Sequence, residues 1–137
     1  MHALTRPILP VLALVLLAAC ETPAPPPAPS GAEDYAAYCA ACHGPQGRGD
    51  GPAAAGLPQR PADLTRLSDR NGGTFPATRV MAKIWGYTGG RQGSAVMPAF
   101  GALLEGETVL YDGGDGIDTP TPLPLVQLAE YLRGLQG

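Results

Sequence analysis

The sequence predicts one small helical domain that starts near residue 31, because helical patterns stand at both ends of this region and no convincing run of strands lies between them. Ser30-Gly31-Ala32-Glu33 has the Ser-x-x-Glu spacing of a capping box, which starts a helix. Near the other end, five apolar residues recur with the spacing of one helix face: Leu125, Leu128, Ala129, Leu132 and Leu135. A chain of 137 residues has room for one such domain.

The positions of proline and glycine predict where the elements between these two helices begin and end. The first helix is expected to run from Gly31 to about Cys42 and to end at Gly44-Pro45. The remaining expected elements are a short helix near 62–67, a helix over 77–85 with Pro76 at its first position and Thr74 as its cap, and one short strand over 108–111.

The region before residue 31 resembles an export signal followed by a spacer. Residues 8–19 are an apolar run of twelve, too short for a membrane span of about 20 residues but suited to a secretory signal. The run ends in Leu17-Ala18-Ala19-Cys20, which resembles the lipobox of bacterial lipoproteins. That resemblance implies a signal peptide over 1–19 and acylation of Cys20. An ordinary cleavage site with an incidental cysteine, or an uncleaved anchor, are the alternatives.

Residues 20–30 would then form an acylated, proline-rich tether. Five of the ten residues from Glu21 to Ser30 are proline, and such a segment runs extended over roughly 30 Å. The expected domain, 31–137, contains 28 glycines and prolines in 107 residues. A chain so rich in loops has a thin core of its own, and it folds more readily around a large apolar cofactor.

The motif Cys39-Ala40-Ala41-Cys42-His43 indicates covalent attachment of a c-type haem. Cysteines three residues apart share a helix face, so both thiols reach one edge of a porphyrin and His43 points at the iron. A zinc site would need two more ligands, and the chain offers only Cys20 and His2. A thiol–disulfide centre would need a βαβ pattern that is absent, and a simple disulfide leaves His43 unexplained.

Around this motif the chain resembles the class I c-type cytochromes, over roughly residues 32–137. The matching stretches are YCAACHGPQGRGDGP, AVMPAFG and LAEYLRGL. The resemblance implies a small all-α fold, wrapped around one covalent haem c, in which the N- and C-terminal helices cross. It places Tyr131 at that crossing, against Ala36 or Ala37.

Elimination shortens the list of candidate residues for the sixth ligand of the iron. A second histidine is excluded because the only other one is His2. Met97, Met81 and Lys83 remain as candidates. Met81 lies mid-helix, where methionine usually fills the core, whereas Met97 precedes Pro98 in a glycine-rich loop and resembles the axial methionine of the family. His43 and Met97 are the predicted metal ligands, and this pair closes both axial positions and raises the reduction potential.

Further contacts to the haem are expected from the loops. Gly51-Pro52 resembles the Gly-Pro of the family, so the Pro52 carbonyl is the predicted acceptor for the second N–H of His43. Trp85, Tyr87 and Arg91 are candidates for contact with a haem propionate, with Trp85 alternatively a core residue. Residues 112–118 do not match the calcium loop of an EF-hand and are interpreted as a solvated turn.

Charge is unevenly distributed along the chain. Seven of the eight basic residues after Cys20 lie between Arg48 and Arg91, and five acidic residues lie between Glu105 and Asp118. This dipole bears on docking with a partner and on the carboxylates of a haem. No basic cluster of the kind that binds nucleic acid is present.

These observations predict an electron carrier and not an enzyme. The chain is expected on the periplasmic side of a bacterial membrane, the inner rather than the outer one, held by the lipid at Cys20. Its redox partner proteins are unidentified. The alternative is a haem-bearing subunit of a periplasmic oxidoreductase or oxidase complex. A peroxidase needs an open iron that one haem motif with Met97 does not leave, and a gas sensor would need Met97 to bind weakly.

Overall fold

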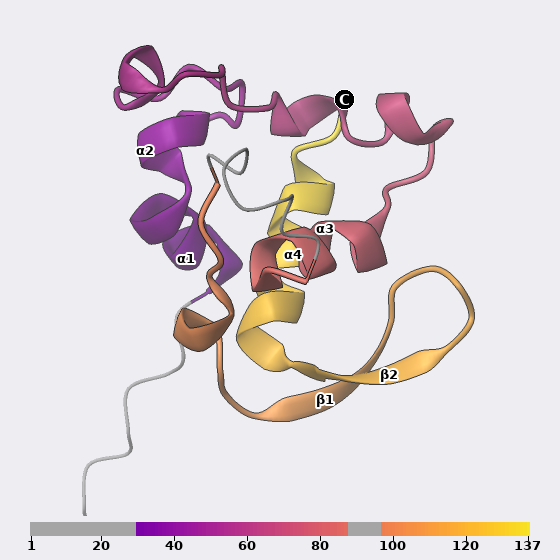
Figure 1. Ribbon diagram of the computed structural model, residues 1–137. Coiled ribbons are helices and arrows are strands. Elements are labelled where there is room, and N and C mark those ends of the chain that lie inside the picture. Colours follow the sequence, from indigo (N-terminus) through magenta and orange to yellow (C-terminus); the bar gives the residue numbers. More distant parts are fainter. Residues whose placement is uncertain (1–29, 88–96) are drawn as a thin grey trace, which may run out of the picture.

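The computed structural model describes residues 30–87 and 97–137, and Figure 1 shows their arrangement. The helices are α1 (Gly31–Tyr38), α2 (Ala40–His43), α3 (Ala77–Trp85) and α4 (Leu123–Gly134), and the strands are β1 (Thr108–Asp112) and β2 (Asp118–Pro122). Four 3-10 helices complete the described part: η1 (Ala54–Gly56), η2 (Leu64–Arg66), η3 (Asp69–Asn71) and η4 (Gly101–Leu103). Two predicted residues, Cys20 and Arg91, lie outside the described ranges.

The first helix starts as predicted but ends earlier. The Ser30 side chain accepts from the Glu33 N–H and the Ser30 N–H donates to the Glu33 carboxylate at 2.6 Å, so the capping box is formed. The expected helix to Cys42 is divided, because Cys39 adopts φ −114° and separates α1 from α2. Gly44 ends α2 with φ +80°, a conformation that glycine adopts without strain.

Helix α3 has the predicted bounds, but its first turn differs from the prediction. Pro76 stands at the N-cap and not at the first helical position, and no side chain caps the helix. The missing N–H of proline costs nothing there, because the first N–H groups of a helix have no intrahelical partner. Helix α4 buries the predicted apolar face: Leu125, Leu128, Ala129 and Leu132 are all buried.

The expectation of an all-α fold is not met, since β1 and β2 form a two-stranded antiparallel sheet. The register pairs Thr108 with Pro122 and Asp112 with Asp118. Only β1 carries a strand pattern in the sequence. The second strand, Asp-Thr-Pro-Thr-Pro, lacks two backbone donors, which a strand tolerates at the edge of a sheet. Both strands of a hairpin are edges, so the prolines fit.

The turn between the strands is a local hydrogen-bonded structure. The Asp112 carboxylate accepts from the N–H groups of Gly114, Asp115 and Gly116 at 2.7–3.0 Å. These backbone donors hold the pKa of the Asp112 carboxyl below its usual range. The carboxylate is therefore occupied by its own turn.

The N- and C-terminal helices cross at very close range. Gly31 lies against the backbone of α4, where a Cβ would stand 2.0 Å from the Gln127 carbonyl oxygen. One turn further on, Tyr35 is 2 % exposed and its ring centroid lies 5.1 Å from that of Tyr131. Tyr131 therefore packs on Tyr35 and not on Ala36 or Ala37, which are exposed.

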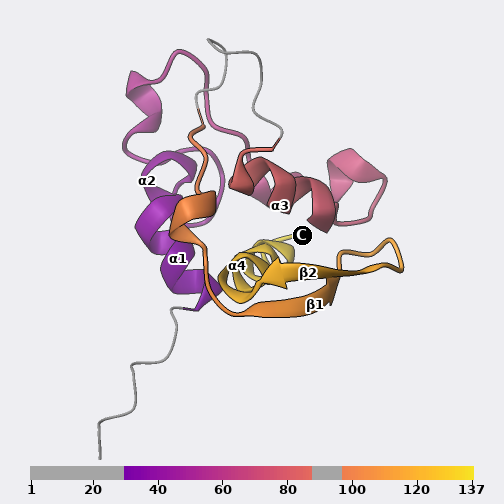
Figure 2. The same cartoon turned by 60° about the horizontal axis from the view of Figure 1, so that its bottom comes forward.

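Helix α3 and the hairpin complete the body around α4. Figure 2 looks along α4, with α1 and α2 beside it, α3 above it and the hairpin below. The core joins Tyr35, Leu104 and Leu128 with the buried faces of α3 and α4. No helix within the described ranges is long and apolar enough to cross a membrane.

Candidate haem-binding site

Two adjoining cavities, each of about 460 Å³, open between α1–α2, the 57–71 segment and α3. Both lie in the size range of cofactor pockets, roughly 300–1,000 Å³. They share five lining residues, Cys39, His43, Ala62, Lys83 and Met97. We call them together the cleft. The inner cavity continues to Leu64, Leu67, Arg70, Asn71, Pro76, Arg79, Val80, Ile84 and Leu132, and the outer cavity to Tyr38, Cys42, Leu57, Gln59, Arg60, Pro61, Pro98 and Phe100.

Both thiols of the motif line the cleft, Cys39 in both cavities and Cys42 in the outer cavity alone. Cys39 is buried, Cys42 is half-buried, and both are free. Burial raises the pKa of the Cys39 thiol to about 11, and the nearby Asp34 carboxylate adds to the effect. A thiol–disulfide centre depends on a thiolate, which a lowered pKa favours. The raised pKa of the Cys39 thiol does not favour that alternative.

The imidazole of His43 is oriented by a backbone carbonyl. His43 is the last residue of α2, and its Nδ1 lies 2.9 Å from the Ala62 carbonyl oxygen. A carbonyl only accepts, so Nδ1 carries the hydrogen and donates. The basic electron pair is then on Nε2, the arrangement that a metal-binding histidine needs.

The acceptor is thus Ala62, and the prediction of the Pro52 carbonyl is wrong. Pro52 is exposed, and the Gly51-Pro52 segment packs instead on the backbone of α2. The Gly51 N–H donates to the Cys42 carbonyl at 3.1 Å, and a Cβ at Gly51 would meet the Ala41 carbonyl oxygen at 2.4 Å. This close approach requires glycine and braces the helix that presents the motif.

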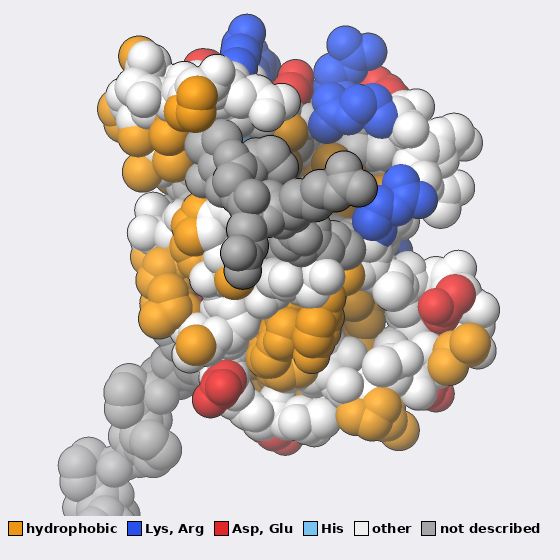
Figure 3. All heavy atoms as spheres, in the orientation of Figure 1, with side chains coloured by type: hydrophobic (Ala, Val, Ile, Leu, Met, Phe, Trp, Pro, Cys, Tyr) orange, Lys and Arg blue, Asp and Glu red, His pale blue; other side chains and the backbone are white. Residues whose placement is uncertain are grey.

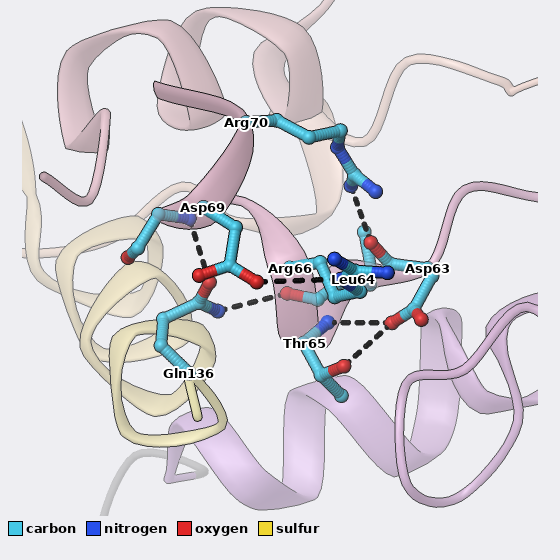
Figure 4. A network of polar contacts seen from close by, with 8 residues as sticks. Asp63, Leu64, Thr65, Arg66, Asp69, Arg70 and Gln136 are labelled. Carbon is cyan, nitrogen blue, oxygen red and sulfur yellow. Dashed lines mark hydrogen bonds and ion pairs between the residues drawn. The ribbon is translucent and has the colours of Figure 1, made fainter. Parts of the chain in front are cut away.

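A polar network holds the segment that supplies the Ala62 carbonyl (Figure 4). Asp63 accepts from the Thr65 N–H and hydroxyl at 2.9 and 2.7 Å, which starts η2. Gln136, just after α4, donates to the Leu64 carbonyl at 2.8 Å and accepts from the Ser68 N–H at 2.9 Å. The C-terminal segment therefore fixes the position of a loop that follows the haem motif by about twenty residues.

The three candidates for the sixth ligand divide into two groups. Met97 and Lys83 line both cavities, as His43 does. Met81 is 9 % exposed within the hydrophobic core and lines neither cavity. A thioether has a free electron pair and binds iron directly, whereas a lysine amine must first lose a proton. Met97 is therefore the better donor at neutral pH.

Trp85 does not lie where a haem contact was predicted. Its ring stacks on Tyr87 at 6.1 Å, and a Cβ at Gly101 would stand 2.9 Å from it. Trp85 lines neither cavity, which agrees with the alternative interpretation as a core residue. Tyr87 is 79 % exposed. The third candidate of this group, Arg91, is outside the described residues.

Sequence reasoning missed several residues of the cleft. Ala62 acts through its carbonyl, which every residue carries, so no side-chain signal marks it. Arg79 was readable, because it lies four residues before the candidate ligand Lys83 and residues four apart on a helix share a face. Their neighbours on α3, Val80 and Ile84, also line the inner cavity.

The lining suits a haem. It is mainly apolar and includes both thiols, and an imidazole nitrogen and a thioether sulfur are available as donors. This donor pair is one of the known axial sets of haem proteins. In the described ranges no group of three or more His, Cys, Asp or Glu side chains forms a metal site of its own.

Comparison with models of protein families matches residues 26–109 to the family described as cytochrome C oxidase, cbb3-type, subunit III. The match covers 84 of the 137 residues and includes the Cys39–His43 motif and Met97. The searches of curated proteins and of solved structures return no significant match. From its motif, its cleft and this match, the chain belongs to the cbb3-type cytochrome c oxidase subunit III family and is a haem-binding c-type cytochrome.

Proposed function

We propose that this protein is an electron carrier with one haem, attached through Cys39 and Cys42 and ligated by His43 and Met97. One observation carries the proposal. A single cleft, largely apolar, is lined by both thiols, by the oriented imidazole and by the thioether, although these residues come from segments more than fifty positions apart.

Cys39 and Cys42 would attach the haem, and His43 and Met97 would bind its iron and set its reduction potential. When bound, the haem iron gains and loses one electron. His43 Nδ1 is held by the Ala62 carbonyl at 2.9 Å, which leaves Nε2 as the free nitrogen and would strengthen it as a donor to iron. Met97 as the second protein ligand would raise the reduction potential, and an iron held by both His43 and Met97 would favour electron transfer over oxygen chemistry.

Membership in an oxidase subunit family favours a second candidate, a haem-bearing subunit of a larger redox complex. The same cleft serves a free carrier and a subunit, because the protein supplies potential and docking in both cases. Solubilising native membranes in mild detergent and identifying what stays bound through purification separates the two candidates. A free carrier is recovered alone.

We propose the location from the sequence before the domain. Residues 1–19 would be removed as a signal peptide, and the lipid on Cys20 with the 20–30 tether would hold the cytochrome on the periplasmic side of a membrane. The several acyl chains of a lipoprotein anchor stably, whereas one chain binds only marginally.

The axial pair is tested by two matched substitutions of methionine. In Met97→Ala the oxidised protein is expected to lose the near-infrared band of a methionine–iron(III) bond, to bind carbon monoxide readily and to fall in potential. Met81→Ala is expected to keep the band and to lose about 2–5 kcal/mol of stability, because Met81 fills the core.

Two results would contradict the proposal. If Met81→Ala abolishes the band and Met97→Ala keeps it, the ligand assignment is reversed. If the wild-type protein binds carbon monoxide rapidly, the iron is open and the carrier function gives way to a sensor or an enzyme.

A further inference from the structure

The cleft carries positive charge without any lining carboxylate to balance it. Arg60, Arg70, Arg79 and Lys83 line the cavities, and no Asp or Glu is among the described lining residues. The whole chain, in contrast, has a net charge of −3. Figure 3 shows the Lys and Arg side chains of one face gathered in its upper part. Cations beside a mainly apolar cleft favour an anionic ligand.

The two arginines of the inner cavity retain donors for such a ligand. Arg70 donates to the Asp63 carbonyl, which uses one of the five N–H groups of its guanidinium. Arg79 makes no hydrogen bond or ion pair to a side chain within the described residues, and residues 88–96 contain no acidic residue. Arg66, which lines neither cavity, is by comparison already paired with Asp69 at 3.3 Å.

The cleft also has a direction. Cys42 lines only the outer cavity, whereas Arg70, Asn71 and Arg79 line only the inner one. In haem the two vinyl groups, which react with thiols, and the two propionates occupy opposite edges of the ring. Attachment at Cys39 and Cys42 therefore directs the carboxylates away from Cys42.

We infer that Arg70 and Arg79 form the propionate-binding end of the cleft and receive the two carboxylates of the haem. This inference rests on the proposed function and assigns a role that the sequence reasoning gave to Trp85, Tyr87 and Arg91. A guanidinium suits it because its planar fork binds a carboxylate through two parallel hydrogen bonds. The Asn71 amide lines the same cavity and adds a neutral donor.

The pairing would set the potential as well as the orientation of the cofactor. Reduction adds one negative charge to the iron, so nearby cations favour the reduced state and raise the potential. They also keep the propionates ionised, because an opposite charge favours the charged form. The described lining contains no other carboxyl group, and the pKa of the Asp63 carboxyl beside Arg70 is lowered by its hydrogen bonds to Thr65 and by the charges of Arg70 and Arg66. The potential of the wild type is therefore expected to be flat from about pH 5 to about pH 8.

The experiment compares the haem-loaded proteins carrying Arg70→Gln, Arg79→Gln, Arg60→Gln and Arg66→Gln, which all lose one positive charge. Midpoint potentials are measured by redox titration across this pH range. Arg70→Gln and Arg79→Gln are expected to lower the potential and to make it fall with rising pH. Arg66→Gln and Arg60→Gln are expected to stay close to the wild type, since Arg66 lies outside the cleft and Arg60 at its Cys42 end. Arg79→Lys keeps the positive charge, so its midpoint potential should lie close to that of the wild type and above that of Arg79→Gln.

Each outcome decides the inference. If Arg70→Gln and Arg79→Gln shift the potential no more than Arg66→Gln, or if Arg60→Gln has the largest effect, the inference is wrong. If Arg70→Gln fails to fold because its bond to the Asp63 carbonyl is lost, Arg79→Gln alone decides. A wild-type chain that retains no haem after denaturation would overturn the proposed function together with the inference. A chain with covalent haem and methionine ligation, but no effect of either arginine, overturns the inference alone.

Discussion

Replacing Gly31 by alanine is expected to destabilise the protein by forcing α1 away from α4. The new Cβ would stand 2.0 Å from the Gln127 carbonyl oxygen, 2.4 Å from its carbon and 2.9 Å from the Leu128 nitrogen. All three are backbone atoms of a helix, so no side chain can rotate out of the way. Ordinary contact begins near 3.4 Å, and the carbonyl must therefore move by about 1.4 Å.

The magnitude follows from two opposing effects. Overpacking of this kind costs about 1–3 kcal/mol of the free energy of unfolding. Alanine in place of glycine inside a helix regains at most about 1 kcal/mol, and less at Gly31, the first residue of α1. Because the clash is with backbone atoms that cannot rotate away, the cost is expected in the upper part of that range. A net loss of about 1–3 kcal/mol then remains, which lowers the melting temperature by about 4–8 °C for each kcal/mol in a domain of this size.

Gly134→Ala is the matched control, because Gly134 is also helical and no atom beyond its chain neighbours and its own helical backbone lies within 4 Å of its added Cβ. This variant is expected to be unchanged or more stable by about 0.4–1 kcal/mol. Both variants would be unfolded in guanidinium chloride with their haem attached, followed by helical circular dichroism. Equal stability of the two variants would refute the close crossing of α1 and α4.

Two further predictions concern a buried carboxyl and the anchor. Asp34 is 4 % exposed, and burial, followed by the charge of Glu33, raises the pKa of its carboxyl. The folded state then binds the proton more tightly than the unfolded state, so stability falls as the pH rises from about 3.9, the ordinary pKa of aspartate, through the raised pKa. Asp34→Asn should remove this fall in the free energy of unfolding, measured by denaturant unfolding at a series of pH values. If the variant shows the same pH dependence as the wild type, the fall does not come from Asp34. Cys20→Ser should release the cytochrome into the soluble fraction or leave it unprocessed, as fractionation and intact mass would show. A variant that is cleaved and still sediments with membranes would argue against lipid attachment at Cys20.

The sequence by itself determined the features that depend on neighbours along the chain. The Ser30–Glu33 capping box, the bounds of α3 and the apolar face of α4 were all readable, because capping, proline and helical periodicity act over a few residues. The Cys39–His43 motif likewise predicted a c-type cytochrome, which the family match confirms. A spacing of three or four residues is enough to place these groups relative to one another.

Only the tertiary structure decided which distant groups meet. The partner of His43 is the carbonyl of Ala62, nineteen residues away, and carbonyls are identical along the chain. The strand β2 forms despite its two prolines because β1 supplies a register. The cations of the inner cavity share one end of the cleft because the 57–71 segment, α3 and α4 fold against one another. Such contacts depend on packing between remote segments, and packing selects among many local arrangements that the sequence pattern alone leaves equal.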